Sequence, residues 1–187
     1  MRKILVSNLI SLDGFYEGPN DEIDFFVVDQ EFLAYAAEML NSVDAILFGR
    51  KTYEHMAAYW PTAPTDAVAD KMNGLPKIVF SKTLQKVDWN NSRLAKGELV
   101  EEVNKLKQQP GGDMVVLGSA TVASQLLQLG LIDEYRVLIN PVLIGGGKPL
   151  FRGITERIKV KLLATRSLAS GMVILSYGKA RWLSAGS

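Results

Sequence analysis

The sequence predicts a single α/β domain over residues 1–187, with a mostly parallel central sheet flanked by helices and a C-terminal antiparallel hairpin. Two observations predict this class. Short apolar runs rich in strand-forming residues alternate with segments whose apolar residues recur at three- and four-residue spacing. In addition, 48% apolar and 22% charged residues over 187 positions are typical of one globular core, without repeats or linkers.

The expected elements follow from these two patterns. Strands are predicted at 4–10, 45–48, 77–80, 114–117 and 135–139, with a weak or irregular strand within 87–96. Amphipathic helices are predicted from 29 to about 43, from 50 to near 60, at 99–106 and at 121–129, with one short helix within 62–74. Asp29 and Thr65 are the expected N-caps of two of them. Residues 160–167 and 172–177, around Ser170-Gly171, predict the terminal hairpin.

Composition excludes several classes of function. The chain has no cysteine and only one histidine, His55, which argues against thiolate metal sites, His-rich metal sites and a Ser–His–Asp triad. A net charge of +1 gives no electrostatic footprint for nucleic acid or an anionic membrane. The apolar run at 4–6 is too short for a signal peptide or a membrane span, so a cytoplasmic location is expected.

The segment Leu117-Gly118-Ser119-Ala120-Thr121 joins a predicted strand to a predicted helix. Its small residues leave the unpaired N–H groups of the helix start accessible, and these groups attract phosphate together with the helix dipole. The segment lacks a full Gly-x-Gly-x-x-Gly pattern. A plain helix start, capped by the Ser or Thr hydroxyl, is therefore the alternative.

Two further strand ends carry polar groups. Gly49-Arg50-Lys51-Thr52 places cations at a helix N-terminus, where the dipole disfavours them unless an anion binds there. Ser81-Lys82-Thr83 follows the third strand and could recognise the extra phosphate of NADPH, or form an ordinary polar turn. Both segments follow strands of a sheet whose carboxyl edge is the usual ligand site in α/β folds.

Isolated residues give weaker hypotheses. Asp13, in Asp13-Gly14, is first a turn signal, and the alternative is that it borders the pocket as an acid or orders a loop. Tyr53 and Trp60 could stack on a flat heterocycle or serve as core anchors.

The order of these motifs resembles the dihydrofolate-reductase-like superfamily, from about Lys3 to Tyr177. The matching segments are Ser11–Gly14, Asp44–Tyr53, Val79–Leu84, Val116–Ala120 and Leu131–Tyr135. Downstream, Pro141-Val142-Leu143-Ile144-Gly145-Gly146-Gly147-Lys148-Pro149-Leu150-Phe151 is most similar to the C-terminal reductase domain of riboflavin-biosynthesis deaminase–reductases and its stand-alone relatives.

This resemblance implies an NADPH site. In the superfamily the Gly-Arg-x-Thr segment and the Gly-rich strand–helix turn hold the pyrophosphate, and the Ser after the third strand lies near the adenosine phosphate. Carried over residue by residue, the resemblance assigns to the cofactor Gly49, Arg50, Thr52, Ser81, Lys82, Gly118, Ser119, Ala120 and Thr121.

The resemblance also implies a function, that of an NADPH-dependent oxidoreductase that acts on a small flat nitrogen heterocycle. The substrate that the resemblance favours is a riboflavin-pathway pyrimidine of the 5-amino-6-ribosylaminouracil phosphate type. A dihydrofolate or pterin reductase stays open, although Asp29, Glu31 and Glu38 do not match the expected position of its acid. A non-catalytic nucleotide-binding module and a structural dimer without nucleotide stay open as well. Relatives often pair as homodimers, for which the apolar C-terminal strands could supply a contact.

Overall fold

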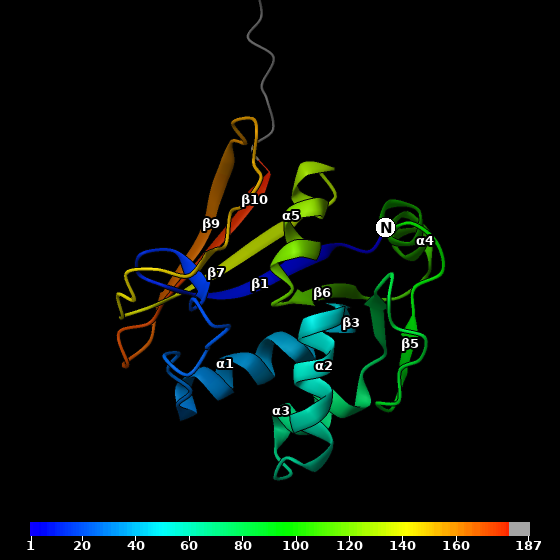
Figure 1. Cartoon of the computed structure of the whole chain (residues 1–187), viewed down its shortest axis with the longest axis horizontal. Coiled ribbons are helices and arrows are strands. Elements are labelled where there is room, and N and C mark those ends of the chain that lie inside the picture. The colour runs from blue at the N-terminus through cyan, green and yellow to red at the C-terminus, as the bar shows by residue number, and fades with distance from the viewer. Residues whose placement is uncertain (180–187) are drawn as a thin grey trace, which may run out of the picture.

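A computed structural model describes residues 1–179 of the chain. Its centre is an eight-stranded sheet in the order β5-β4-β3-β6-β1-β7-β10-β9 (Figure 1). The strands of this sheet are β1 (Ile4–Ser11), β3 (Val43–Gly49), β4 (Lys77–Phe80), β5 (Ser92–Leu94), β6 (Asp113–Leu117), β7 (Glu134–Asn140), β9 (Val160–Ser167) and β10 (Val173–Lys179). Only β9 and β10 run antiparallel to their neighbours. The predicted fold class is confirmed.

Helices cover both faces of the parallel part of the sheet (Figure 1). On one face lie α1 (Gln30–Asn41), α2 (Arg50–Tyr59) and α3 (Ala67–Gly74), and on the other α4 (Leu99–Gln108) and α5 (Ala120–Gln128). A short 3-10 helix, η1 (Trp60–Thr62), follows α2. Successive side chains of β3 point to opposite faces of the sheet and so pack with both helix layers. Ile46 and Phe48 pack with α1–α3, and Ala45 and Leu47 pack with α4 and α5.

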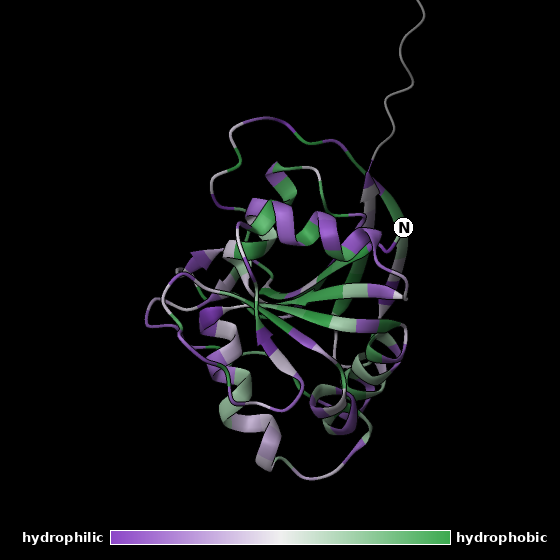
Figure 2. Cartoon of the chain, turned by 90° about the vertical axis from the view of Figure 1, so that its right-hand side faces the viewer, coloured by the Kyte–Doolittle hydropathy of each residue, from purple (hydrophilic) through white to green (hydrophobic). Residues whose placement is uncertain are grey.

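The hydropathy of the chain follows this layering. The central strands are largely hydrophobic, and the polar residues of the helices face outward (Figure 2). Because such strands are buried on both faces, they appear in the sequence as continuous apolar runs, as the expected strands did. Asp29 caps α1 as predicted: its carboxylate accepts a hydrogen bond from the Phe32 N–H at 2.8 Å.

Two local expectations require correction. The N-cap of α3 is Asp66, whose carboxylate accepts from the N–H groups of Val68 and Ala69, and Thr65 does not have this role. The second correction is a two-stranded sheet that the sequence did not predict. It pairs β2 (Phe15–Glu17) with β8 (Lys148–Pro149), in segments for which neither a strand nor a helix was expected.

The topology sets the position of the site. Strands β4, β3, β6, β1 and β7 are parallel neighbours, so their carboxyl ends lie along one edge of the sheet. The turns that precede α2 and α5 follow β3 and β6, which pair directly. Two helix N-termini therefore lie side by side at this edge.

Candidate functional site

A groove of about 510 Å³ lies at the carboxyl edge of the sheet. Its walls come from the starts of α2, α4 and α5, from the turn after β4, and from β2. The predicted cofactor residues in its lining are Gly49, Arg50, Thr52, Ser81, Lys82, Ser119, Ala120 and Thr121. Gly118, the remaining predicted residue, lies directly before this wall. The structure thus brings three separate sequence motifs together in one groove.

The starts of α2 and α5 are joined by two hydrogen bonds. The Gly49 N–H donates to the Ser119 hydroxyl at 2.7 Å, and the Ser119 N–H donates to the Thr52 hydroxyl at 3.0 Å. Each turn therefore holds the other, and the spacing between the two helix starts is fixed without a ligand. Such preorganisation lowers the cost of binding a ligand that spans both starts.

The turn before α5 has a strained backbone. Gly118 and Ser119 both have left-handed conformations, with φ of 58° and 47°. For Ser119 this costs on the order of 1 kcal/mol and needs support from the surroundings. The support comes from β1, where the Gly118 N–H donates to the Ser7 carbonyl and the Asn8 amide donates to the Gly118 carbonyl at 2.8 Å.

Asn8 was not predicted as part of the site. It is 1% exposed, and its amide oxygen accepts a hydrogen bond from the Tyr135 hydroxyl at 3.1 Å. The signal in the sequence was the polar pair Ser7-Asn8 inside the apolar run of β1. A buried amide in a strand requires partners, and here one partner is the turn of the groove.

The helices at the groove differ in their caps from the helices elsewhere. Asp29 and Asp66 cap α1 and α3 with their carboxylates. Within residues 1–179, no side chain caps α2, α4 or α5, whose N-cap residues are Gly49, Glu98 and Ser119. The Ser119 hydroxyl is occupied by Gly49 instead. The first-turn N–H groups of α2 and α5 are therefore not satisfied by side-chain caps, as an anion site requires.

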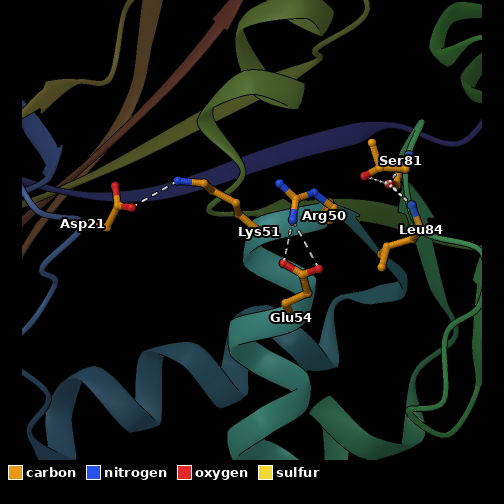
Figure 3. Close-up of polar contacts among 7 residues, drawn as sticks. Asp21, Arg50, Lys51, Glu54, Ser81 and Leu84 are labelled. Carbon is orange, nitrogen blue, oxygen red and sulfur yellow. Dashed lines mark hydrogen bonds and ion pairs between the residues drawn. The ribbon is translucent and has the colours of Figure 1, made fainter.

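Within the described residues, the cations of the groove are held by exposed ion pairs alone. Arg50 contacts Glu54 at 3.1 Å and Lys51 contacts Asp21 at 3.1 Å (Figure 3). Lys82 lies 3.8 Å from the carboxylate of Glu98. Exposed pairs of this kind contribute about 0–1 kcal/mol each. These side chains can therefore turn to a bound phosphate at little cost.

The two ends of the groove differ in character. At one end the turn after β4 is fixed by Ser81, whose hydroxyl accepts from the N–H groups of Thr83 and Leu84 at 3.1 and 2.9 Å (Figure 3). Lys51 and Asp21 lie on the side of Arg50 that is away from Ser81 (Figure 3). Lys148 contacts both Asp21 and Glu17 of β2, so Glu17 and its neighbour Tyr16, which both line the groove, belong to its other end.

Neither residue of β2 was predicted as part of the site. Burial raises the pKa of the half-buried Tyr16 phenol, which is therefore protonated at neutral pH. Glu17 pairs with Lys148 at 2.9 Å, and Lys148 also contacts Asp21. Tyr16 also lines an adjoining hollow of about 440 Å³ between α5 and residues 150–153.

Asp13 lies outside the groove lining. Its carboxylate accepts hydrogen bonds from the N–H groups of Gly145 and Ile144 at 2.8 and 3.3 Å. A hydrogen bond with Ser11 and these backbone bonds lower the pKa of Asp13. A carboxyl group with a lowered pKa is ionised at neutral pH, so the geometry favours the ordering of the 144–145 loop over proton donation.

Tyr53 lies in the core, the half-buried Trp60 packs against the core, and neither side chain lines the groove. Tyr53 is 5% exposed, its ring packs near Phe48 and Trp89, and its hydroxyl accepts a hydrogen bond from the backbone N–H of Trp89 at 3.0 Å. Trp60 packs against the same cluster, and its indole N–H contacts the Met56 sulfur at 3.2 Å. Both side chains thus have the core-anchor role, and neither offers a ring to a ligand in the groove.

The acids considered for a folate-type proton donor are also engaged elsewhere. Asp29 caps α1, the Glu31 carboxylate accepts from the Ala169 N–H at 2.6 Å, and Glu38 pairs with Arg166 at 2.9 Å. None of the three lines the groove. Among residues 1–179 there is also no cluster of three or more His, Asp or Glu side chains that could hold a metal ion, and no helix there has the length and apolarity to cross a membrane.

Comparison with known proteins identifies the family. The model of the RibD C-terminal domain matches residues 2–174, so the chain belongs to this family. Two uncharacterised Bacillus subtilis proteins are similar over most of their length. YyaP is 36% identical over 180 residues, covering 94% of each chain, and YwjB is 26% identical over 176 residues, covering 91% of this chain and 95% of YwjB.

Solved structures share the fold. A putative riboflavin biosynthesis protein from Shewanella has a TM-score of 0.75 at 21% identity, covering 96% of this chain and 99% of its own. A deaminase/5-amino-6-(5-phosphoribosylamino)uracil reductase from Thermotoga maritima has a TM-score of 0.69 at 14% identity, covering 96% and 57%. Enterococcus faecalis dihydrofolate reductase, complexed with NADP(H), has a TM-score of 0.66 at 13% identity, covering 96% and 97%.

Proposed function

We propose that this protein is an NADPH-dependent reductase that transfers hydride to a flat nitrogen heterocycle, with a pyrimidine of the 5-amino-6-ribosylaminouracil phosphate type as substrate. One observation carries the proposal: the starts of α2 and α5 lack side-chain caps and are braced together at the carboxyl edge of the sheet. This arrangement fits a diphosphate, because it offers two sets of N–H groups at a fixed spacing. Membership of the RibD C-terminal family supports the reductase class.

The residues of the groove fit the cofactor. The first-turn N–H groups of α2 and α5, including those of Thr52, Ala120 and Thr121, would hold the pyrophosphate together with the Thr52 and Ser119 hydroxyls as donors, and Arg50 would be the guanidinium partner. Gly49 and Gly118 would allow the close approach of the phosphates. A side chain at Gly118 would intrude here, since an added Cβ would lie 3.1 Å from the Thr52 methyl carbon. When bound, the reduced nicotinamide supplies the hydride, and the protein contributes orientation and exclusion of water.

The groove also suggests which way the dinucleotide lies. Ser81 and Lys82 form one end, so an adenosine phosphate held by them places the reacting ring toward Tyr16 and Glu17. In this arrangement the protonated Tyr16 phenol can donate a hydrogen bond near the reacting ring. The proposal thus assigns the phosphate contacts to the helix starts and the nicotinamide end to β2.

Calorimetric titration with NADPH and NADH, followed by an assay of NADPH oxidation, tests this function. We expect binding of NADPH in preference to NADH, and oxidation with the ribosylaminouracil phosphate but not with dihydrofolate. Dihydrofolate turnover would instead identify a pterin reductase, whose acid must then lie outside Asp29, Glu31 and Glu38. Binding without turnover of either compound would identify a nucleotide-binding module, and no binding would refute the proposal.

The Arg50→Ala variant tests the phosphate contact. Arg50 loses only an exposed pair with Glu54, so folding stability should change by less than about 0.5 kcal/mol. The affinity for NADPH should fall about tenfold, since a charge-assisted bond to phosphate is lost. The matched control is Arg157→Ala, an exposed arginine outside the groove, which should bind NADPH like the unmodified protein. Equal affinity of both variants would remove Arg50 from the site.

A further inference from the structure

The hollow between α5 and residues 150–153 adjoins the groove. Its volume of about 440 Å³ lies within the range of about 300–1,000 Å³ that is usual for small-ligand sites. Tyr16, Thr121 and Gln125 line both the groove and the hollow, so the two spaces meet at these side chains. Ser124 and Arg152 line the hollow alone. A ligand with one part at the Tyr16 end of the groove can therefore extend into the hollow.

The lining of the hollow is polar and carries a single charge. One wall consists of hydroxyl and amide side chains of α5, namely Thr121, Ser124, Gln125 and Gln128. Their three- and four-residue spacing places them on one face of the helix. Arg152, from the segment that forms the other wall, is the one charged residue in the lining. Neutral hydrogen-bonding groups with one guanidinium fit a ligand that has several hydroxyl groups and one anionic group.

The guanidinium of Arg152 has no carboxylate partner among residues 1–179. The guanidinium groups of Arg93, Arg136 and Arg166, by contrast, each pair with a glutamate. Burial raises the pKa of the Tyr16 phenol and Arg152 acts in the opposite direction, which places the guanidinium near the phenol. An arginine without a carboxylate partner can offer its planar set of donors to a phosphate.

The wall that carries Arg152 is anchored on both sides of this residue. Leu150 is 1% exposed, and its N–H donates to the Gly14 carbonyl at 3.1 Å. The Gly153 carbonyl accepts a hydrogen bond from the Gln128 amide at 2.5 Å. The hollow is therefore shaped without a ligand, and such preorganisation lowers the cost of binding.

We propose that the hollow binds the phosphorylated ribosyl chain of the substrate, with Arg152 on the phosphate and the hydroxyl and amide groups of α5 on the ribosyl hydroxyls. This inference rests on the proposed function, in which the reacting ring lies at the Tyr16 end of the groove. The helix starts and the cations of the groove hold the phosphates of the dinucleotide in that function. A phosphate monoester on the substrate therefore needs a separate cation, and Arg152 is the cation that the adjoining hollow offers.

Two variants change the hollow without changing the lining of the groove. Arg152→Gln removes the charge, and Ser124→Leu places an apolar side chain against the position of the ribosyl chain. Arg157→Gln is the matched control, because Arg157 is an exposed arginine of the same segment and lines neither space. Arg152 is exposed and Ser124 is half-buried, so none of the three changes should unfold the chain, and thermal unfolding followed by circular dichroism checks this.

Calorimetric titration with ribose 5-phosphate measures binding in the hollow without turnover. The protein is first saturated with NADP⁺, so that the phosphate sites of the groove are occupied. We expect ribose 5-phosphate to bind the unmodified protein and Arg157→Gln at least about tenfold more tightly than Arg152→Gln, because a charge-assisted bond to phosphate is lost. Ribose should bind all three proteins equally weakly. Equal affinity of Arg152→Gln and the unmodified protein for ribose 5-phosphate would overturn the proposal.

Steady-state kinetics connect the hollow with the substrate. The KM for the ribosylaminouracil phosphate should rise at least about tenfold in Arg152→Gln and in Ser124→Leu, while the Kd for NADPH stays unchanged. Ribose 5-phosphate should inhibit competitively with this pyrimidine, and non-competitive inhibition would overturn the proposal by showing a separate effector site.

The site in the hollow and the reductase function can fail separately. Binding of ribose 5-phosphate that depends on Arg152, without NADPH oxidation by the unmodified protein, would support the phosphate site and refute the reductase function. NADPH oxidation with an unchanged KM in both hollow variants would support the reductase function and refute the site.

Discussion

The Lys77→Met variant is expected to lower the free energy of unfolding by about 3 kcal/mol, because backbone carbonyls at a buried helix end lose the hydrogen bonds that they accept from a charged donor. Lys77 is 0% exposed. Its ammonium donates to the carbonyls of Met72, Asn73 and Leu75 at 2.8, 3.1 and 2.8 Å, and it lies 4.4 Å from the centre of the Trp89 ring. The three donors of the ammonium thus serve three carbonyls at the end of α3.

Methionine has a similar length but cannot donate, so these carbonyls would remain without that partner. Urea unfolding measures the loss. Lys86→Met is the matched control, because Lys86 is exposed and forms only a surface pair with Asp88. The control should change stability by less than about 0.5 kcal/mol. A Lys77→Met loss no larger than that of the control would show that the ammonium does not stabilise the end of α3.

The same lysine predicts a pH dependence. Burial lowers the pKa of Lys77 to about 8, from an ordinary value of 10.5. Between these two pH values the Lys77 amine is protonated in the unfolded chain but not in the folded chain. The contribution of Lys77 to the free energy of unfolding therefore decreases as pH falls from 10.5 to 8, and it is constant below pH 8. The difference in stability between the unmodified protein and Lys77→Met should therefore be larger at pH 10 than at pH 7.5. An equal difference at both pH values would contradict the lowered pKa.

The sequence predicts the parallel sheet well because its signals are local. An apolar run such as 114–117 has to be buried on both faces, and the glycine and small residues that follow it have to turn into a helix. The groove was predictable for the same reason. Each of the three sequence motifs in its lining directly follows a strand, and the carboxyl ends of parallel strands meet at one edge.

The missing parts depend on contacts between distant residues. Strand β2 pairs with β8, more than 130 residues further along the chain, and neither segment has an alternating pattern of its own. Asn8 supports Gly118 across 110 residues. Asp66 and Thr65 are both acceptable caps by residue type, and the choice depends on where the chain enters α3. Tyr53 is amphipathic, so its spacing alone could not distinguish a core anchor from a ligand contact.

The β2–β8 pairing provides the second large expected effect. Replacing Gly147 with alanine should weaken NADPH binding about tenfold, which corresponds to about 1.4 kcal/mol. Gly147 has φ of 140°, and an added Cβ would lie 2.2 Å from the Glu17 carbonyl oxygen. Backbone atoms cannot yield as a flexible side chain does, so β2 must move away from β8. Tyr16 and Glu17 would then leave the end of the groove where the proposed nicotinamide site lies.

Gly146→Ala is the matched control at the neighbouring position, because an added Cβ there has no atom within 4 Å. Calorimetric titration of both variants with NADPH makes the comparison, and their melting temperatures show whether the rest of the fold is intact. Adenosine 2′,5′-bisphosphate should bind both variants equally, since its proposed contacts lie at the Ser81–Lys82 end of the groove. Weaker binding of the bisphosphate to Gly147→Ala would mean that the groove changed as a whole. Unchanged NADPH affinity in Gly147→Ala would show that β2 does not contact the bound dinucleotide.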